Sequence, residues 1–345
     1  MIIQALGATN ERLRAFYETD CTLRFFTLIL LTVQNSALVL FTKFSYRPSA
    51  IPYVPSTVVS FSECLKLFMS CALVVSSEGR ESLSAALCDI PSNVFRLLLP
   101  SALYVLQNNL LFEGVLRLSP ATYITCSQSK ILTSAFFGMI LLKTRITRQQ
   151  SLALCLLTIG IVLVQSDSKG VITEARDSDR KATWNGVLIV FAASIISGFT
   201  GAYLEKIYKE VDVRRGKRPS IWFRNAQLAC FSVPLAFFTV FWQDGRSVAE
   251  NGMFKGYDSI VLALIMLQAS GGLIVAAVMR YASNVLKCFA VSISICNCAL
   301  LAKFVLGNQG HGMSTLNMVG VILVITATFC YTGKIKERLN AKKPA

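Results

Sequence analysis

Two apolar stretches decide how this chain folds: SPATYITCSQSKILTSAFFGMILL at 119–142 and NVLKCFAVSISICNCALLAKFVL at 284–306. Each is long enough to cross a bilayer as a helix, which takes about 20 residues. Each also contains a lysine, Lys130 in the first stretch and Lys287 in the second. A charge near the bilayer centre costs about 2.5 to 3.5 kcal/mol on insertion scales. We therefore expect both lysines to be functional, and the function that suits such a cation is to hold an anion.

The rest of the chain has the same apolar character. Of its 345 residues, 54% are hydrophobic and 15% are charged, and the mean hydropathy is +0.56. Apolar blocks between polar breaks predict an all-α polytopic membrane protein, because a helix satisfies its own backbone hydrogen bonds in lipid. Ten transmembrane helices are expected, at 23–42, 54–76, 94–116, 119–142, 149–166, 184–207, 219–242, 259–281, 284–306 and 315–332.

A polar loop at 167–183 divides these spans into two five-helix halves, at 23–166 and 184–332. Because five is odd, the second half enters the membrane from the opposite side, so duplicated halves would be inverted repeats with a site between them. Weak internal similarity supports duplication: VLRLSPA resembles VMRYASN, and IGIVLV resembles VGVILV. Lys130 and Lys287 then lie in the fourth helix of each half and face one cavity at staggered depths.

Charge sets the expected orientation. The formal net charge is +15, but the basic residues are distributed over loops and form no stripe for nucleic acid. They are most frequent on the side of the two termini, which places both termini in the cytosol. We expect a cytosolic segment at 1–22, solvated rather than on the membrane surface, and a cytosolic basic tail at 333–345. The N-terminal segment lacks the features of a cleaved secretory signal.

Polar side chains within other spans extend the candidate site. Glu63 and Lys66 are three residues apart, so they share a helix face and can neutralise each other. A structural or gating pair and a substrate contact are both open interpretations of them. Tyr123 lies seven residues before Lys130 and therefore on the same helix face. The alternative for the uncharged polar residues is that they join helices to one another, which is common in membranes.

These residue types indicate a class of ligand. Two ammonium groups with amides and tyrosines suit a phosphorylated ligand that carries a flat base. The chain shows no glycine-rich phosphate loop and no metal-ligand spacing, its single histidine (His311) falls in a polar turn, and its 11 cysteines are expected to be packing residues. We therefore expect no cofactor, no metal and no catalytic residue, and we do not expect an enzyme.

Several blocks resemble the nucleotide-sugar transporters, in the branch that carries UDP-N-acetylglucosamine, UDP-galactose and CMP-sialic acid. They are YVLQNNLLF, PATYITCSQSKILT, SGFTGAYLEKIYKE, IWFRNAQL, NGMFKGYDS, GGLIVAAVMRYASNVLKCFA and GVILVITATF, and together they extend over nearly the whole chain. The resemblance implies the ten-helix inverted-repeat fold of the drug/metabolite transporters. It also implies antiport, in which a nucleotide sugar enters the Golgi or ER lumen in exchange for a nucleoside monophosphate.

The resemblance implies site residues as well. Those expected around the nucleotide and phosphates are Tyr104, Asn108, Tyr123, Lys130, Ser197, Asn225 and Lys287, and those expected nearer the sugar are Glu63 and Lys66. The chain departs from the family pattern at Ile124, Ser127, Ser283 and Cys288, beside the two lysines. The order of expected substrates is UDP-N-acetylglucosamine, then UDP-galactose, then CMP-sialic acid.

Two other functions are alternatives. A proton-coupled exporter of small metabolites on the same fold would need an intramembrane carboxylate, for which Glu63 is the strongest candidate. A membrane enzyme or structural protein that binds nucleotide sugars without moving them is the other.

The expected partners are a nucleotide sugar, a nucleoside monophosphate and the lipid bilayer, with no nucleic acid and with a homodimer left open. The C-terminal Lys342-Lys343 has the form of a dilysine retrieval signal read by a coat protein, and a generic basic tail is the equal alternative. The expected location is the Golgi membrane, with the ER or cycling between the two as the variant.

Overall fold

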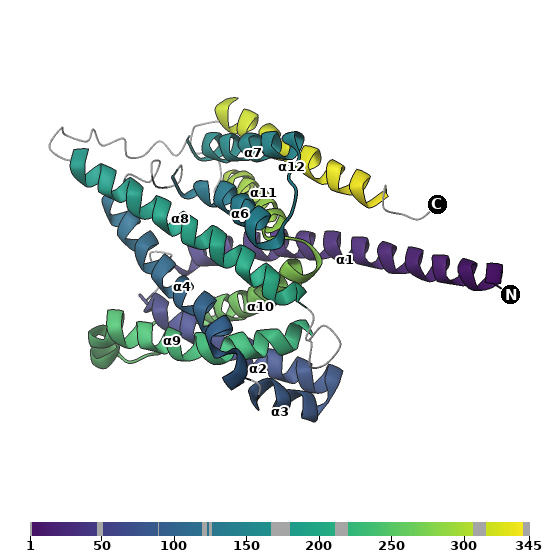
Figure 1. The fold of residues 1–345 in the computed structure, drawn as a ribbon. Helices are drawn as coiled ribbons and strands as arrows, with labels where there is room; N and C mark the ends of the chain where they lie inside the picture. Colours follow the sequence, from purple (N-terminus) through teal and green to yellow (C-terminus); the bar gives the residue numbers. More distant parts are fainter. Residues whose placement is uncertain are drawn as a thin grey trace.

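The computed structural model describes residues 2–46, 51–88, 90–118, 123, 126–166, 180–210, 220–305 and 315–340. Within these residues the chain forms eleven helices and no strand (Figure 1). The helices are α1 (Ile2–Ser45), α2 (Pro55–Glu78), α3 (Arg80–Cys88), α4 (Ile90–Arg117), α6 (Ser129–Leu142), α7 (Arg148–Ser166), α8 (Arg180–Lys209), α9 (Ile221–Asn251), α10 (Ser259–Tyr281), α11 (Asn284–Val305) and α12 (Thr315–Asn340).

The helices have the length and composition of a multi-pass membrane protein. In the described part of the chain, five segments are long and apolar enough to cross a bilayer: Thr22–Thr42, Pro55–Glu78, Trp184–Lys209, Ile221–Asn251 and Ser259–Tyr281. Four shorter apolar helical segments coincide with other expected spans: Ser129–Leu142, Arg148–Val164, Asn284–Cys298 and Met318–Thr332. The remaining expected span, 94–116, falls within α4. The all-helical class predicted from the sequence is thus confirmed.

Local sequence explains where several helices begin and end. α2 starts with Pro55, whose missing N–H is harmless at a helix start, and it ends at Glu78, followed by Gly79 as the cap with a φ of 87°. Two later helices begin with a side-chain cap: Ser220 accepts a hydrogen bond from the Phe223 N–H at 3.1 Å, and Asp258 accepts one from the Val261 N–H at 2.9 Å. These caps fix the starts of α9 and α10.

The helix boundaries differ from the expected ones in two places. α1 begins at Ile2, well before the expected span at 23–42, and no proline interrupts it, so the segment before that span is helical from Ile2 onward. The short helix α3 between α2 and α4 was not predicted. Two features fall outside the residues described, namely most of the polar loop, at 167–179, and the Lys342-Lys343 pair.

The helices pack so that α6 and α11 lie inside the bundle. Figure 1 shows α7 and α12 at one edge and α2, α3 and α9 at the other. α7 and α12 touch through their backbones, since a Cβ at Gly160 would lie 2.9 Å from the Gly320 carbonyl oxygen. α8 packs on both α4 and α6, and α1 packs on both α10 and α11. The largest apolar core joins α6, α7, α11 and α12 through residues such as Ile131, Leu157, Phe289 and Val324.

Candidate functional site

The two lysines each lie in the first turn of a helix inside the bundle. Lys130 is the second residue of α6 and Lys287 is the fourth residue of α11, and both are half-buried. Among the residues that the structure describes, neither ammonium group has a hydrogen bond or an ion pair. The charge of Lys287 acts on Lys130, both lysines interact electrostatically with Cys288, and Lys287 also interacts with Glu205 of α8. Two lysines inside a helix bundle, without an ion pair in the described part of the chain, form a site that an anion would stabilise.

Cys288 follows Lys287 directly on α11, and its side chain contacts α6. Its thiol is buried and lies 3.9 Å from the Ser134 hydroxyl of α6. This contact, with the apolar packing of Ile131 and Phe289, holds α6 against α11. We refer to Lys130, Lys287 and Cys288 as the lysine cluster.

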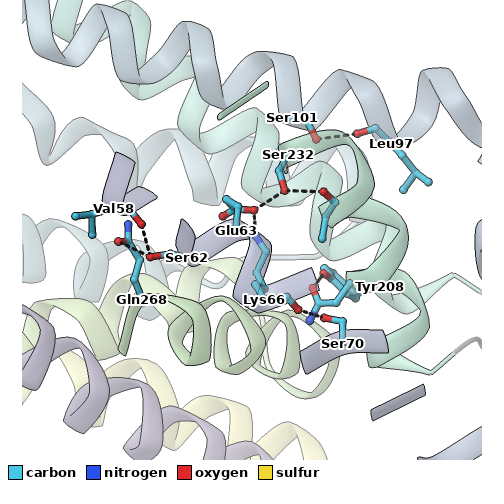
Figure 2. A network of polar contacts seen from close by, with 12 residues as sticks. Val58, Ser62, Glu63, Lys66, Ser70, Leu97, Ser101, Tyr208, Ser232 and Gln268 are labelled. Carbon is cyan, nitrogen blue, oxygen red and sulfur yellow. Dashed lines mark hydrogen bonds and ion pairs between the residues drawn. The ribbon is translucent and has the colours of Figure 1, made fainter. Parts of the chain in front are cut away.

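A second polar group is built around Glu63 on α2. Its carboxylate forms an ion pair with Lys66, as the spacing of three residues predicted, and accepts a hydrogen bond from the Ser232 hydroxyl of α9 (Figure 2). The Lys66 and Glu63 side chains are only 17% and 22% exposed. The Lys66 chain rests on α10, where a Cβ at Gly272 would lie 2.6 Å from its Cδ. A glycine at 272 therefore provides the space that Lys66 occupies.

Tyrosines and an asparagine complete this group. The buried Tyr208 hydroxyl of α8 donates to Asn225 Oδ1 of α9 at 2.5 Å, while Asn225 Nδ2 has no hydrogen-bond partner in the described part of the chain. Tyr104 of α4 is 36% exposed and, like Tyr208, interacts electrostatically with Glu63. We refer to Glu63, Lys66, Tyr104, Tyr208, Asn225 and Ser232 as the carboxylate cluster.

The remaining predicted residues are Tyr123, Ser197 and Asn108. Tyr123 is half-buried against α4, with its Cε2 3.7 Å from where a Cβ at Gly114 would be. Ser197 is half-buried on α8, beside Gly198, where a Cβ would lie 2.7 Å from the Ser134 backbone nitrogen of α6. This close approach puts Ser197 at the α6–α8 contact. The Asn108 side chain falls outside the described residues.

The structure thus brings Lys130 together with Lys287, and Glu63 and Lys66 together with Tyr104 and Asn225. Sequence reasoning missed three buried polar residues near them: Tyr208, Arg224 and Gln227, of which Arg224 Nη1 donates to Gln227 Oε1 at 3.0 Å. For Arg224 and Gln227 the signal was present, because an arginine and two amides within the span at 219–242 are as unusual as the lysines; Tyr208 lies outside that span and gave no such signal. Ser232 gave no such signal, since a lone serine commonly joins membrane helices.

Comparison with known proteins identifies the family. The model of the nucleotide-sugar transporter family matches residues 19–332. A solved crystal structure superposes with a TM-score of 0.63 at 14% identity, covering 93% of this chain and 98% of that chain, which is a likeness of fold alone.

Curated relatives match over similar lengths. The UDP-N-acetylglucosamine transporter of Homo sapiens is 36% identical over 332 residues, which are 93% of this chain and 98% of the relative. The UDP-galactose transporter of Schizosaccharomyces pombe is 36% identical over 322 residues, 90% of this chain and 88% of the relative. Because the family model and these relatives extend over nearly the whole sequence, the chain belongs to the nucleotide-sugar transporters.

Proposed function

We propose that this chain is an antiporter that exchanges a UDP-sugar for UMP across the Golgi or ER membrane. UDP-N-acetylglucosamine is the first expected substrate and UDP-galactose the second. The observation that carries the proposal is the lysine cluster, in which two cations lack an ion pair within the described residues. A lysine binds phosphate as a point charge, so the same two groups suit a diphosphate and a monophosphate. Each ligand can then displace the other, which is what exchange requires.

The uridine nucleotide is supported by the relatives. The human and fission-yeast relatives are named as transporters of UDP-N-acetylglucosamine and UDP-galactose, and one from Caenorhabditis elegans is named for both. These names describe transport rather than catalysis, in keeping with a non-enzymatic role. Because these three names all specify a UDP-sugar, a CMP-sialic acid/CMP exchanger is a weaker candidate for this chain.

The carboxylate cluster is the proposed contact for the sugar. A neutral sugar offers hydroxyl and acetamido groups, which bind to paired charges, hydroxyls and amides without needing a net charge. The same pairing argues against the proton-coupled exporter, because Glu63 is held by both Lys66 and Ser232. A carboxylate fixed in this way is a poor proton carrier.

Alternating access would follow from two inverted five-helix repeats, 23–166 and 184–332. If α1, α2, α4, α6 and α7 correspond to α8, α9, α10, α11 and α12, each major helix contact should have a counterpart. The contact of α4 with α8 has its counterpart in α10 with α1, and that of α6 with α8 in α11 with α1. The contact of α2 with α10 likewise has its counterpart in α9 with α4. The contacts of α7 with α12 and of α2 with α9 each join two equivalent helices, so each is its own counterpart. This pairing, with the bias of basic residues, supports ten spans with both termini in the cytosol.

The test is counterflow in proteoliposomes. Vesicles loaded with UMP should take up labelled UDP-N-acetylglucosamine several-fold faster than empty vesicles, and CMP- or GMP-loaded vesicles should resemble empty ones. K130A and K287A should abolish the stimulation, whereas K255A should not, because Lys255 is an exposed lysine that donates a hydrogen bond to Asn251, one turn before it in sequence, at 2.5 Å. Equal uptake into loaded and empty vesicles would reject exchange. Uptake driven by a pH gradient alone would favour the proton-coupled alternative.

A further inference from the structure

The corner between α10 and α11 is held by polar groups from two other helices. α10 ends at Tyr281 and α11 begins at Asn284, so only two residues join them. Arg24 of α1 donates to the Tyr281 carbonyl oxygen at 3.0 Å, and Lys209 of α8 donates to the Ala282 carbonyl oxygen at 2.6 Å. In the reverse direction, Arg280 donates to the Tyr208 carbonyl oxygen at 2.6 Å. A two-residue corner therefore receives directed bonds from α1 and α8, which fix its place in the bundle.

Glu205 is the centre of this arrangement. One carboxylate oxygen accepts a hydrogen bond from the Asn284 backbone N–H at 2.7 Å, and the other accepts one from Lys209 at 2.6 Å. The Glu205 side chain is only 4% exposed. The free-energy cost of burying a carboxylate is offset when both of its oxygens are paired, as they are here.

The bond to Asn284 places a negative charge at the start of α11. The first backbone N–H groups of a helix have no partner within the helix, and that end carries a partial positive charge. Lys287 lies in the same first turn, where a cation is unfavourable for the helix. Its ammonium group interacts electrostatically with Glu205. The carboxylate thus offsets both the helix end and the lysine.

The packing beneath this contact leaves little freedom. Asn284 is 1% exposed and lies against α8, where a Cβ at Gly201 would be 2.4 Å from both of its amide atoms. Gly201 lies one turn before Glu205 on the same helix. The start of α11 is therefore seated on α8 by a close backbone approach and by one buried carboxylate.

We propose that Glu205 is a positioning residue for substrate binding: by holding the first N–H of α11 and, with Lys209, the preceding corner, it fixes where Lys287 presents its ammonium group to phosphate. The inference rests on the proposed function, since it assigns to Lys287 a phosphate of the nucleotide. Glu205 itself does not touch the ligand. Its effect on binding must therefore pass through Lys287.

A double-mutant cycle on UMP binding tests this route. With purified protein in detergent, E205Q should raise the Kd for UMP about tenfold, the scale of one charged hydrogen bond. In a K287Q background, E205Q should change the Kd by less than about twofold, because the residue through which it acts is already gone. The matched control is E210Q: Glu210 pairs with Arg96 at 2.7 Å at the same end of α8. E210Q should leave the Kd within about twofold of wild type.

Each outcome decides between the inference and the proposed function. Wild-type protein that does not bind UMP rejects the proposed function, and the inference with it. UMP binding that K287Q weakens and E205Q leaves unchanged rejects the inference alone, as do equal effects of E205Q in the wild-type and K287Q backgrounds. If E205Q gives no folded protein, E205Q/K209M is compared with K209M, because removing both charges leaves no unpaired buried cation.

Discussion

The two clusters of the candidate site differ in whether their charged side chains are paired. In the lysine cluster, Lys130 and Lys287 repel each other and have no ion pair among the described residues. In the carboxylate cluster, Glu63 is paired with Lys66 and Ser232, and Tyr208 is paired with Asn225. The lysine cluster therefore offers two cations to an anionic ligand, whereas the carboxylate cluster offers a polar surface whose charges are already paired. On the proposed function, the lysine cluster would set the affinity for the nucleotide and the carboxylate cluster the preference for the sugar.

The largest effect should come from removing both charges of the lysine cluster. Each single variant, K130Q or K287Q, should weaken UMP binding by about 10- to 100-fold, the range for hydrogen bonds to charged groups. The K130Q/K287Q double variant should reduce UMP-driven uptake to the level of empty vesicles. Binding is measured by calorimetry in detergent, and uptake in vesicles loaded with UMP.

A matched variant in the carboxylate cluster sharpens this contrast. K66Q also removes a half-buried lysine, but one already paired with Glu63, so UMP binding should change only a few-fold. Equal losses for K66Q and K130Q would remove the distinction between the two clusters.

The next effect concerns stability rather than binding. E63Q should leave Lys66 without its partner and destabilise the protein by about 1 to 3 kcal/mol, less than for a fully buried pair because both side chains are partly exposed. E63Q/K66M removes both charges and should recover most of this loss. Thermal unfolding in detergent measures the three proteins. A double variant less stable than E63Q would show that the two residues do not act as a pair.

The sequence predicts the site residues that have a high insertion cost or a regular spacing. Lys130 and Lys287 are identified because a lysine in an apolar span is costly to insert into a bilayer, and Glu63 and Lys66 are identified because their spacing puts them on one helix face. The contacts of Ser232, Tyr208 and Glu205 could not be predicted in this way. Each joins residues far apart in the chain, such as Ser232 with Glu63 and Glu205 with Asn284, and depends on how the helices are seated. Gly272 could not be predicted for the same reason, because its role depends on the packing of the Lys66 side chain from α2 against α10.

A smaller effect should come from Gly272, and it should act on the sugar. G272A places a methyl group 2.6 Å from the Lys66 Cδ, so the lysine chain must move. Overpacking of this kind costs about 1 to 3 kcal/mol, here towards the lower end because Lys66 is flexible. We expect the ratio of UDP-N-acetylglucosamine to UDP-galactose uptake to change by a few-fold, with UMP affinity unaltered.

The control for this prediction is G245A on α9. Nothing lies within 4 Å of a Cβ at Gly245, so the added methyl group meets open space. G245A should leave both the uptake ratio and UMP affinity at wild-type values. A G272A variant that weakens UMP binding and leaves the uptake ratio unchanged would place the nucleotide, rather than the sugar, at the carboxylate cluster.

The smallest effect should come from the Tyr208 hydroxyl. Y208F removes the group that donates to Asn225 Oδ1 at 2.5 Å and keeps the ring that packs against Leu204 and Met279. Asn225 Nδ2 already lacks a hydrogen-bond partner in the described residues, so the variant leaves the whole amide free. One such bond contributes about 0.5 to 1.5 kcal/mol, which corresponds to a change of a few-fold in binding. If Asn225 contacts the ligand, Y208F should alter the Kd of UMP or of the UDP-sugar and lose this effect in an N225A background. If Asn225 only joins α8 to α9, Y208F should lower the melting temperature and leave both Kd values unchanged.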